Sequence, residues 1–573
     1  VVREAWSWQC VNKLCVRGDN PDNPDPSNSL EQCRLTCGDF GSLWPLPTGF
    51  VAISDKVRYF HPSDVSFNLS SVTDFQAYAV KHLFTRMTRK FQDDLQIMCE
   101  EGCEIPSPRA IVSIDVVTAS GDLTQNWLTE EGYAIDIQTR GDQVKVVIQA
   151  ETVYGARHGL ETLTQLMTYI PANKQLVVVT TAKVSDKPSY PHRGLLLDSA
   201  RHYLPLSTLE RTIDAMAAVK LNVLHWHISD SQSFPLVLER VPQLSKYGAY
   251  SQKEVYTLTN VSDLIGYARA RGVRILLELD MPAHAGNGWQ WGEFHGLGAL
   301  AVCVNRQPWR QYCLQPPCGQ LNPANPALYD VLGDVFKDII KYFSTDAIHM
   351  GGDEVYIPCW NQSTEVTNWM KSRGKGLSTA DFLDVWGEFH NKVVQVWDQQ
   401  MGNSKTPVVL WTSHLTDPDY IQQYLDRDRY VIEAWTDAID PTVDRLLSLG
   451  YRMIVATRDT WYLDHGFWGQ TAYHNWRRGY DNRLPNKQGL LGGEAAMWGE
   501  LVDDSNIDSR IWPRAAAVAE RLWTNPTSDS SAAEYRLVAA RDRLVRLGVQ
   551  AEAIMPQWCK QNQGSCAGSA NNS

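Results

Sequence analysis

Two adjacent carboxylates, Asp353 and Glu354, are the side chains of this sequence best suited to acid–base chemistry. They end the run His349-Met350-Gly351-Gly352-Asp353-Glu354, which follows an apolar segment that predicts a buried strand. Like charges at the end of a buried strand repel each other and destabilise the fold unless other groups compensate them. The two glycines let a ligand come close to the backbone. An isolated Asp-Glu pair is usually a solvated turn, so the other strand ends must decide between a turn and a site.

Eight short apolar runs alternate with helical stretches, of which 209–219 and 261–271 are examples. The runs are 194–198, 223–228, 273–279, 347–350, 408–412, 431–435, 453–456 and 490–497. This alternation predicts the α/β class, as a (β/α)8 TIM barrel with loop insertions. Active-site residues of such barrels gather at the carboxyl ends of the strands.

Polar and aromatic side chains follow nearly every predicted strand. They include Asp230, His284, Trp411, Trp435, Tyr462, Asp464, Trp498 and Glu500, while Arg193 stands at the start of the first strand. Aromatic rings cover the C–H faces of a pyranose and carboxylates accept from its hydroxyls, so the mixture favours a sugar ligand.

Two other hydrolase chemistries fit less well. His225 and His227 could face one side of a strand and bind a metal, but no third ligand has zinc-like spacing. A serine hydrolase is disfavoured because the sequence has no Gly-x-Ser-x-Gly elbow. We therefore expect no metal and no cofactor.

The rest of the chain predicts two smaller units before the barrel, because 573 residues are too many for one core. Residues 1–45 are rich in cysteine, and 46–187 mix strand candidates (144–148 and 175–179) with a helix at 157–166. We expect an α+β domain at 46–187, a linker at 186–191, and a barrel with a C-terminal extension at 188–573.

Charge and cysteine content bound the partners and the compartment. The net charge of −12 disfavours nucleic acid, and no run of about 20 apolar residues predicts a membrane span. Twelve cysteines and the sequons at Asn68, Asn260 and Asn361 favour the secretory route, hence a secreted or a lysosomal (vacuolar) protein.

Several cysteines are close neighbours in the sequence. The candidate disulfides are Cys99–Cys103, Cys313–Cys318, Cys559–Cys566, Cys303–Cys359 and, within one cluster, Cys10–Cys37 and Cys15–Cys33. Spacing leaves the connectivity open, and a zinc site in that cluster is the weaker alternative.

The motifs taken together resemble family 20 glycoside hydrolases, the β-N-acetylhexosaminidases. The matching motifs are His349 to Glu354, His192-Arg193-Gly194, Arg201-His202-Tyr203, His225-Trp226-His227, Pro282-Ala283-His284, Trp498-Gly499-Glu500 and Trp512-Pro513-Arg514. The cysteine-rich start and Gly286-Asn287-Gly288-Trp289 are similar to arthropod members, which degrade chitin or trim N-glycans. The resemblance covers the chain and implies a zincin-like α+β domain before the barrel.

The resemblance implies exo-acting, retaining cleavage of terminal β-linked GlcNAc or GalNAc, with the substrate's acetamido oxygen as nucleophile and an oxazolinium intermediate. Glu354 would be the general acid and base, and Asp353 would hold the acetamido N–H. Because neighbours on an extended strand point to opposite sides, these two carboxylates are expected to serve different parts of one sugar.

The remaining roles also come from the resemblance. The acetamido oxygen would be bound by Tyr462, and the pocket would be walled by Trp411, Trp435 and Trp498. Sugar hydroxyls would be bound by Arg193, Asp464 and Glu500, and the leaving sugar by Trp309 and Trp468. The two carboxylates would be supported by Asp230, His284 and His349. The loop after Asp464 is shorter than in insect chitin-degrading members and lacks their cysteines, so chitooligosaccharides, N-glycans and glycolipids all stay open as substrates.

Two further alternatives stay open. One is a catalytically silent, lectin-like barrel that only binds sugars. The other is a homodimer, since family members often dimerise.

Overall fold

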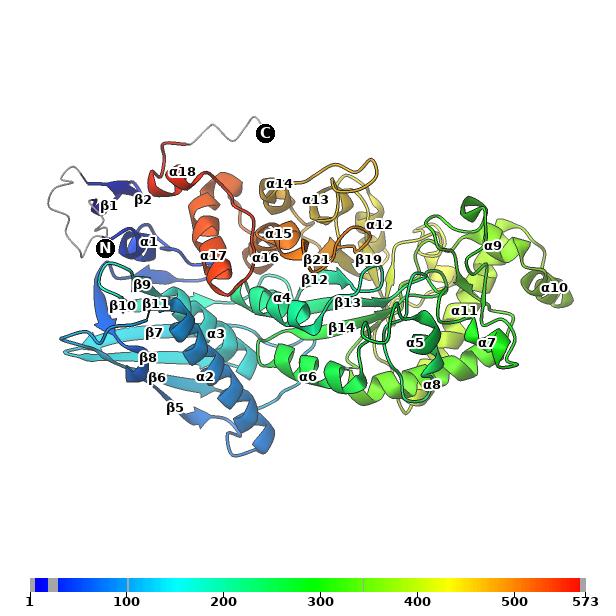
Figure 1. Cartoon of the computed structure of the whole chain (residues 1–573), viewed down its shortest axis with the longest axis horizontal. Helices are drawn as coiled ribbons and strands as arrows, with labels where there is room; N and C mark the ends of the chain where they lie inside the picture. Colours follow the sequence, from blue (N-terminus) through cyan, green and yellow to red (C-terminus); the bar gives the residue numbers. More distant parts are fainter. Residues whose placement is uncertain (1–5, 19–28, 100–101, 344, 567–573) are drawn as a thin grey trace.

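The computed structural model describes residues 6–18, 29–99, 102–343 and 345–566 (Figure 1). Eight parallel strands close a barrel in the order β12-β13-β14-β17-β18-β19-β20-β21. Their bounds are β12 His192–Asp198, β13 Val223–Ser229, β14 Arg274–Leu279, β17 Ile348–His349, β18 Val408–Trp411, β19 Tyr430–Ala434, β20 Arg452–Val455 and β21 Leu490–Met497. The (β/α)8 barrel expected from the sequence is confirmed, and each of the eight apolar runs overlaps one of its strands.

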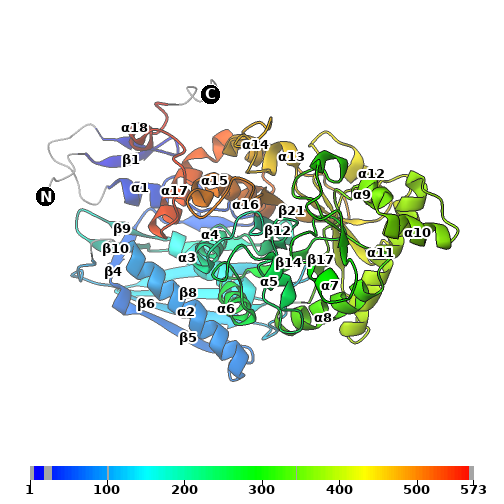
Figure 2. The same cartoon turned by 45° about the vertical axis from the view of Figure 1, so that its right-hand side comes forward.

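The strands of the barrel are buried on both faces. Every residue of β12, β13 and β14 is buried, including polar side chains such as His225, His227 and Glu278 among the apolar ones. Helices cover the outside of the barrel and continue into the C-terminal extension (Figure 2). They are α4 Leu206–Ala218, α5 Gln243–Gly248, α6 Leu258–Arg269, α7 Trp291–Phe294, α8 Ala327–Tyr342, α9 Ile357–Gln362, α10 Thr364–Ser372, α11 Thr379–Gln400, α12 Thr442–Ser448, α13 Arg458–Trp461, α14 Trp476–Asp481, α15 Ile507–Ile511, α16 Arg514–Thr524, α17 Glu534–Arg546 and α18 Gln557–Gln561.

An α+β domain precedes the barrel. Its larger sheet has the order β3-β11-β7-β8-β6-β5 and its smaller sheet the order β4-β10-β9. The elements are β3 Val51–Ile53, β4 Val57–Phe60, β5 Val65–Val72, α2 Tyr78–Met98, β6 Ile111–Thr118, β7 Tyr133–Arg140, β8 Gln143–Ala150, α3 Val153–Gln165, β9 Met167–Ile170, β10 Gln175–Val179 and β11 Ala182–Asp186. Every residue of α3 is buried, because this helix lies between the larger sheet and the barrel.

The cysteine-rich start packs against the end of the chain. It consists of β1 (Trp8–Val11), β2 (Leu14–Arg17) and α1 (Leu30–Thr36), which lie beside α18 in both views. The backbone N–H of Cys15 donates to Oε1 of Gln563 at 2.8 Å. All six candidate disulfides form, including Cys10–Cys37 and Cys15–Cys33, so the four clustered cysteines do not make a zinc site.

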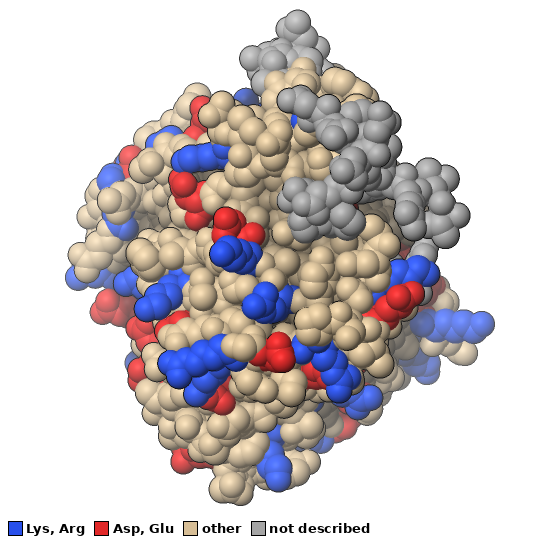
Figure 3. Space-filling model, turned by 90° about the vertical axis from the view of Figure 1, so that its left-hand side faces the viewer, with Lys and Arg blue, Asp and Glu red and all other residues tan. Residues whose placement is uncertain are grey.

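The surface carries both signs of charge. Figure 3 shows Lys and Arg interspersed with Asp and Glu on the end of the molecule that holds the two N-terminal sheets. Among the described residues, no helix combines the length and the apolar character that crossing a membrane requires.

The three sequons lie at different depths. Asn68 and Asn361 are exposed, whereas Asn260 is partly buried and its Oδ1 accepts from the N–H of Thr257 in the capping box of α6. Glycosylation at these positions stays a prediction.

Candidate active site

The backbone after β17 leaves the strand direction at once. Gly351 has a φ of +59°, Gly352 one of +88°, and Glu354 one of +50°, all in the left-handed region. A Cβ at Gly351 would lie 1.8 Å from Oδ1 of Asp280, so only glycine fits beside that carboxyl. This turn places Asp353 and Glu354 at the carboxyl end of the barrel.

Asp353 and Glu354 converge on one imidazole. Nε2 of His284 lies 3.7 Å from Oδ2 of Asp353 and 3.3 Å from Oε2 of Glu354. The expectation that they point to opposite sides of an extended strand is therefore wrong. The strand ends at His349, and the left-handed backbone of Glu354 turns its side chain toward the same imidazole.

His284 is held from its other side by Asp230, and the resemblance implied a supporting role for each of these two residues. Nδ1 of His284 lies 3.1 Å from Oδ2 of Asp230. That carboxylate also lies 2.9 Å from a guanidinium nitrogen of Arg201 and 2.9 Å from Nε2 of His227. Although burial lowers it, the pKa of His284 is raised well above its ordinary value by the surrounding carboxylates, so His284 is a cation.

The pKa of Glu354 reflects this neighbour. Burial raises it, but the hydrogen bond and the charge of His284 outweigh burial and hold the pKa of Glu354 below its ordinary value. The lowered pKa of Glu354 and the raised pKa of His284 together place the proton between these two groups on His284.

Asp280 is a site residue that the sequence analysis does not assign. Its Oδ1 accepts from the N–H of Gly352 at 3.0 Å. Burial and the charge of Asp353 raise the pKa of Asp280 well above its ordinary value, so Asp280 keeps a proton. Burial also raises the pKa of Asp353, and the charge of His284 opposes that rise. The position of Asp280 directly after the third strand was the signal that could have identified it.

A pocket of about 690 Å³ opens over these carboxylates. Nearly every side chain expected to bind sugar lines it. Its lining includes Trp309, Trp411, Trp435, Tyr462, Asp464, Trp468, Trp498 and Glu500, together with Arg201, His284, Gln315, Asp353 and Glu354. Three of the tryptophans come from different strand ends, which gives the pocket aromatic walls on several sides.

Buried polar atoms of this pocket are available to a ligand. Oδ1 of Asp353, Oδ1 of Asp464 and Oε2 of Glu500 have no hydrogen-bond partner among the residues that the structure describes. Buried polar atoms are nearly always paired, so three unpaired carboxylate oxygens facing one cavity suit a ligand with several donors. Burial raises the pKa of Asp464 to about 7 and the pKa of Tyr462 well above its ordinary value, so the Tyr462 hydroxyl keeps its proton.

Arg193 does not reach this pocket, which corrects the sequence prediction. It lies at the start of β12, at the opposite end of the barrel, and donates to both oxygens of Glu131 at 2.9 and 2.8 Å. The pocket is lined instead by Arg201 and Arg458, of which Arg201 follows β12 and also contacts Asp198 at 3.1 Å. The motif around Arg201 was visible in the sequence, and its position after the strand was the signal for its role.

His349 supports the site less directly than expected. It is fully buried inside the barrel, where Nε2 lies 3.2 Å from Oε2 of Glu433 and the ring packs 5.0 Å from that of Trp411. Its Nδ1 accepts from the N–H of Gly351 at 3.0 Å, so His349 supports the turn that carries the carboxylates rather than the carboxylates themselves.

Comparison with known proteins agrees with this geometry. Residues 190–526 match the family described as "Glycosyl hydrolase family 20, catalytic domain", and residues 43–166 match "beta-acetyl hexosaminidase like". The chain belongs to glycosyl hydrolase family 20. It is 40% identical to the chitooligosaccharidolytic beta-N-acetylglucosaminidases of Ostrinia furnacalis (98% of this chain, 96% of the relative) and Bombyx mori (98% and 95%). A solved chitobiase structure from Flavobacterium johnsoniae matches with a TM-score of 0.68 and 26% identity, over 89% of this chain and 73% of that one.

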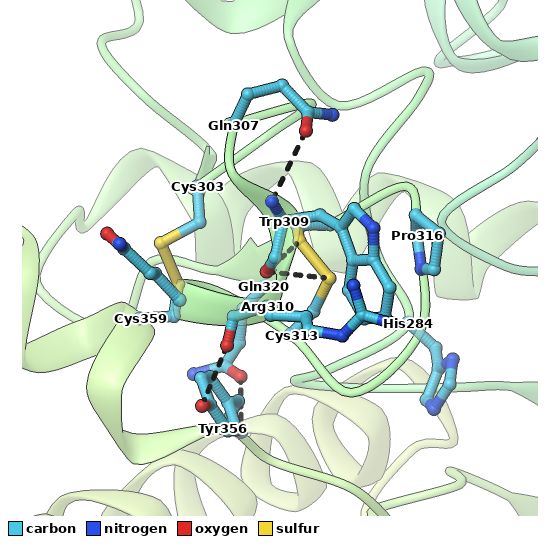
Figure 4. Close-up of a disulfide and its surroundings, with 12 residues drawn as sticks. His284, Cys303, Gln307, Trp309, Arg310, Cys313, Pro316, Gln320, Tyr356 and Cys359 are labelled. Atoms are coloured by element: carbon cyan, nitrogen blue, oxygen red, sulfur yellow. Dashed lines mark hydrogen bonds between the residues drawn. A yellow bond between two sulfur atoms is a disulfide. The ribbon is translucent and has the colours of Figure 1, made fainter.

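One side of the family 20 pocket is formed by a disulfide-stapled loop between β15 (Ala301–Val302) and β16 (Gln320–Leu321) (Figure 4). Cys303–Cys359 anchors the loop to α9, and Cys313–Cys318 closes its tip. Trp309 lies on this loop with the guanidinium of Arg310 4.3 Å from its ring centre. This side of the pocket is suited to contact the part of a ligand that extends away from Asp353 and Glu354.

Imidazole and carboxylate groups that could bind a metal also occur inside the barrel. His225, Glu278 and His349 bring ligand atoms together, yet the two imidazole rings stack at 4.4 Å. Nε2 of His225 lies 2.9 Å from Glu278, whereas ligands of a tetrahedral zinc with bonds of about 2.0 Å are separated by roughly 3.3 Å. The distance fits an ion pair better than a metal site.

Proposed function

We propose that this family 20 glycoside hydrolase removes single β-linked GlcNAc or GalNAc units from the non-reducing ends of oligosaccharides. The observation that supports this most is the joint position of Asp353, Glu354 and Tyr462 in an aromatic pocket. One carboxylate oxygen of Asp353 there is buried and has no partner in the described part of the chain. Arg201, Asp464 and Glu500 line the same pocket and would bind the terminal hydroxyls, which suits exo cleavage.

Asp353 would orient the 2-acetamido group. Its free oxygen would accept the acetamido N–H while the Tyr462 hydroxyl donates to the acetamido oxygen, which then attacks the anomeric carbon. The negative charge of Asp353 would stabilise the oxazolinium that forms. A held intramolecular nucleophile gains roughly 7–11 kcal/mol from proximity, which offsets the weak nucleophilicity of an amide oxygen.

Glu354 would protonate the leaving oxygen and later activate water. Its side chain is 29% exposed, so a bound glycan would remove water from it. Desolvation raises the pKa of a carboxyl, which favours transfer of the shared proton from Nε2 of His284 to Oε2 of Glu354 over their 3.3 Å separation.

The substrate class and the compartment are proposed from the relatives and the disulfides. Two relatives at 40% identity are named chitooligosaccharidolytic, which favours chitooligosaccharides over N-glycans for this chain. The six disulfides favour the secretory pathway, with secretion and lysosomal delivery as the two destinations. Size-exclusion chromatography would distinguish a monomer from the homodimer that the family allows.

The deciding experiment measures turnover of a chromogenic β-N-acetylglucosaminide by the wild type, Glu354→Gln and Asp353→Asn. We expect the wild type to be active, Glu354→Gln to lose nearly all turnover of unactivated oligosaccharides, and a thiazoline mimic of the oxazolinium to inhibit strongly. Sugar binding without turnover by the wild type would instead support the lectin-like alternative. Equal turnover of a substrate that lacks the 2-acetamido group would refute the role of Asp353. Comparing chitotriose with a GlcNAc-terminated N-glycan would identify the preferred substrate.

A further inference from the structure

The interior of the barrel contains a row of alternating carboxylates and imidazoles that ends at the general acid. We name it the imidazole–carboxylate chain, and its members in order are Glu494, His225, Glu278, His227, Asp230, His284 and Glu354. The first five side chains are almost completely buried. Barrels of this fold normally fill their interior with branched apolar side chains, so this interior departs from the common pattern.

Short contacts link the inner part of the chain. Nδ1 of His225 lies 2.7 Å from Oε1 of Glu494, and its Nε2 lies 2.9 Å from Oε2 of Glu278. The same Glu278 oxygen lies 2.7 Å from Nδ1 of His227, whose Nε2 is 2.9 Å from Asp230. His227 uses both ring nitrogens in hydrogen bonds to carboxylates, an arrangement that suits a protonated ring. Nε2 of His225 lies close to Glu278 without a hydrogen-bond partner among the described residues.

Burial of so many ionisable groups is costly unless each is paired. Burial lowers the pKa of His227, but Glu278 and Asp230 raise it to about 10, so His227 is a cation at neutral pH. The groups that face His227 are Glu278 from β14, Asp280 directly after β14, Asp230 after β13, Asp198 from β12, and the edge of the Trp498 ring after β21. None of these groups is freely exposed to solvent, so a change of charge at one of them changes the pKa of its neighbour strongly.

We propose that His225, Glu278 and His227 are positioning residues that act through Asp230 and His284 to set the pH range in which Glu354 works as acid and base. The inference rests on the proposed function, because it assigns that proton exchange to Glu354. The inner part of the imidazole–carboxylate chain fixes the charge of Asp230. The charge of Asp230 sets how tightly His284 binds its proton, and this proton is the one that Glu354 needs. The groups that face Glu354 and His284 at this end are Asp230, Asp280, Asp353 and Arg201.

Neighbouring links of the chain carry opposite charges, which provides a sharp test. His227→Gln removes a positive charge and should move the pH–rate profile to higher pH, because acids near the lost cation bind protons more tightly. Glu278→Gln removes a negative charge and should move the profile to lower pH. At an effective dielectric constant near 20 and a separation of roughly 10 Å, we expect shifts of about one pH unit. The double variant restores the net charge and should return the profile close to that of the wild type, even if its kcat is lower.

Glu433→Gln is the matched control. Glu433 is as deeply buried in the same barrel interior, but burial and its neighbour Glu494 raise its pKa well above the ordinary value, so it is uncharged. Replacing one neutral group by another should leave the pH–rate profile where it is, whatever happens to stability.

The measurement is kcat and kcat/KM for a chromogenic β-N-acetylglucosaminide across pH, with thermal unfolding recorded for each variant. If the pH–rate profiles of the two single variants shift in the same direction, or if neither profile shifts, the imidazole–carboxylate chain only fills the barrel interior. If His227→Gln does not fold, Glu494→Gln should shift the profile as Glu278→Gln does, but less. The pH dependence of binding of a thiazoline inhibitor gives a second readout that needs no turnover. An inactive wild type would refute the proposed function instead, so the two failures are distinguishable.

Discussion

Gly351→Ala should disable the active site while leaving the barrel folded. Gly351 has a φ of +59°, and an added Cβ would lie 1.8 Å from Oδ1, 2.2 Å from Cγ and 2.7 Å from Cα of Asp280. Because real Cβ contacts essentially never fall below 3.0 Å, Asp280 or the turn must move by about 1 Å. Asp280 faces Asp353, so this movement displaces the carboxylate that would hold the acetamide.

The magnitude follows from two separate effects. A left-handed backbone at a residue with a Cβ costs about 1–2 kcal/mol, which lowers the free energy of unfolding without abolishing the fold. A displacement of about 1 Å in an active site can lower the rate by about 10²-fold. We therefore expect kcat/KM to fall at least 100-fold, with a moderate loss of thermal stability.

Gly352→Ala is the matched control for backbone strain. Its φ is +88°, but the nearest atom to an added Cβ is Cδ2 of Leu410 at 3.2 Å, and Asp280 is not among the nearest atoms. The assay compares kcat/KM of both variants on the chromogenic substrate with thermal unfolding of each. If Gly351→Ala stays within about threefold of Gly352→Ala, the contact with Asp280 does not govern the site and the reasoning fails.

Three other predictions concern the pocket and the barrel base. Trp309→Ala should raise KM for chitotriose about tenfold more than for a chromogenic monosaccharide, and equal losses would contradict its role on the leaving-sugar side. Arg201→Lys should raise KM about tenfold by removing the guanidinium fork, whereas Arg193→Lys should lower thermal stability and leave KM within twofold; the reverse pattern would restore Arg193 as the sugar ligand. Burial lowers the pKa of His158 from 6.5 to about 4 despite its contact with Glu131, so only the unfolded chain takes up this proton between those values. The free energy of unfolding should thus fall by roughly 3 kcal/mol as the pH drops through that window, and denaturant unfolding of His158→Gln should show a smaller fall.

The strands of this barrel could be predicted because their residues are buried on both faces. Such strands become short apolar runs, and the order of strand, polar end and helix repeats along the chain. The direction of the strands also separates Arg193 from Arg201. A residue that starts a parallel strand lies at one end of the barrel and a residue that follows it lies at the other, and the prediction for Arg193 neglected this polarity.

Other features of the site depend on contacts between distant segments. The left-handed backbone of Glu354 brings it to His284, and nothing in the local sequence specifies that conformation for a glutamate. Likewise, His349 belongs to the conspicuous motif but contacts Glu433, which is 84 residues further along the chain. A sequence pattern shows which residues are unusual, whereas their partners follow only from the closed barrel.

The charges of the site explain how two adjacent carboxylates can be tolerated. Asp280 keeps a proton and His284 carries a positive charge, so with Asp353 and Glu354 ionised the four groups have one net negative charge. Formation of the oxazolinium sends one proton out with the leaving group. The positively charged intermediate would therefore face the ionised Asp353 and Glu354 beside a neutral His284, and the net charge of the site would stay at minus one. An enzyme stabilises a transition state best when its fixed charges complement the charge that develops there. The adjacency of Asp353 and Glu354, unfavourable by itself because like charges repel, is therefore the electrostatic complement of the proposed intermediate.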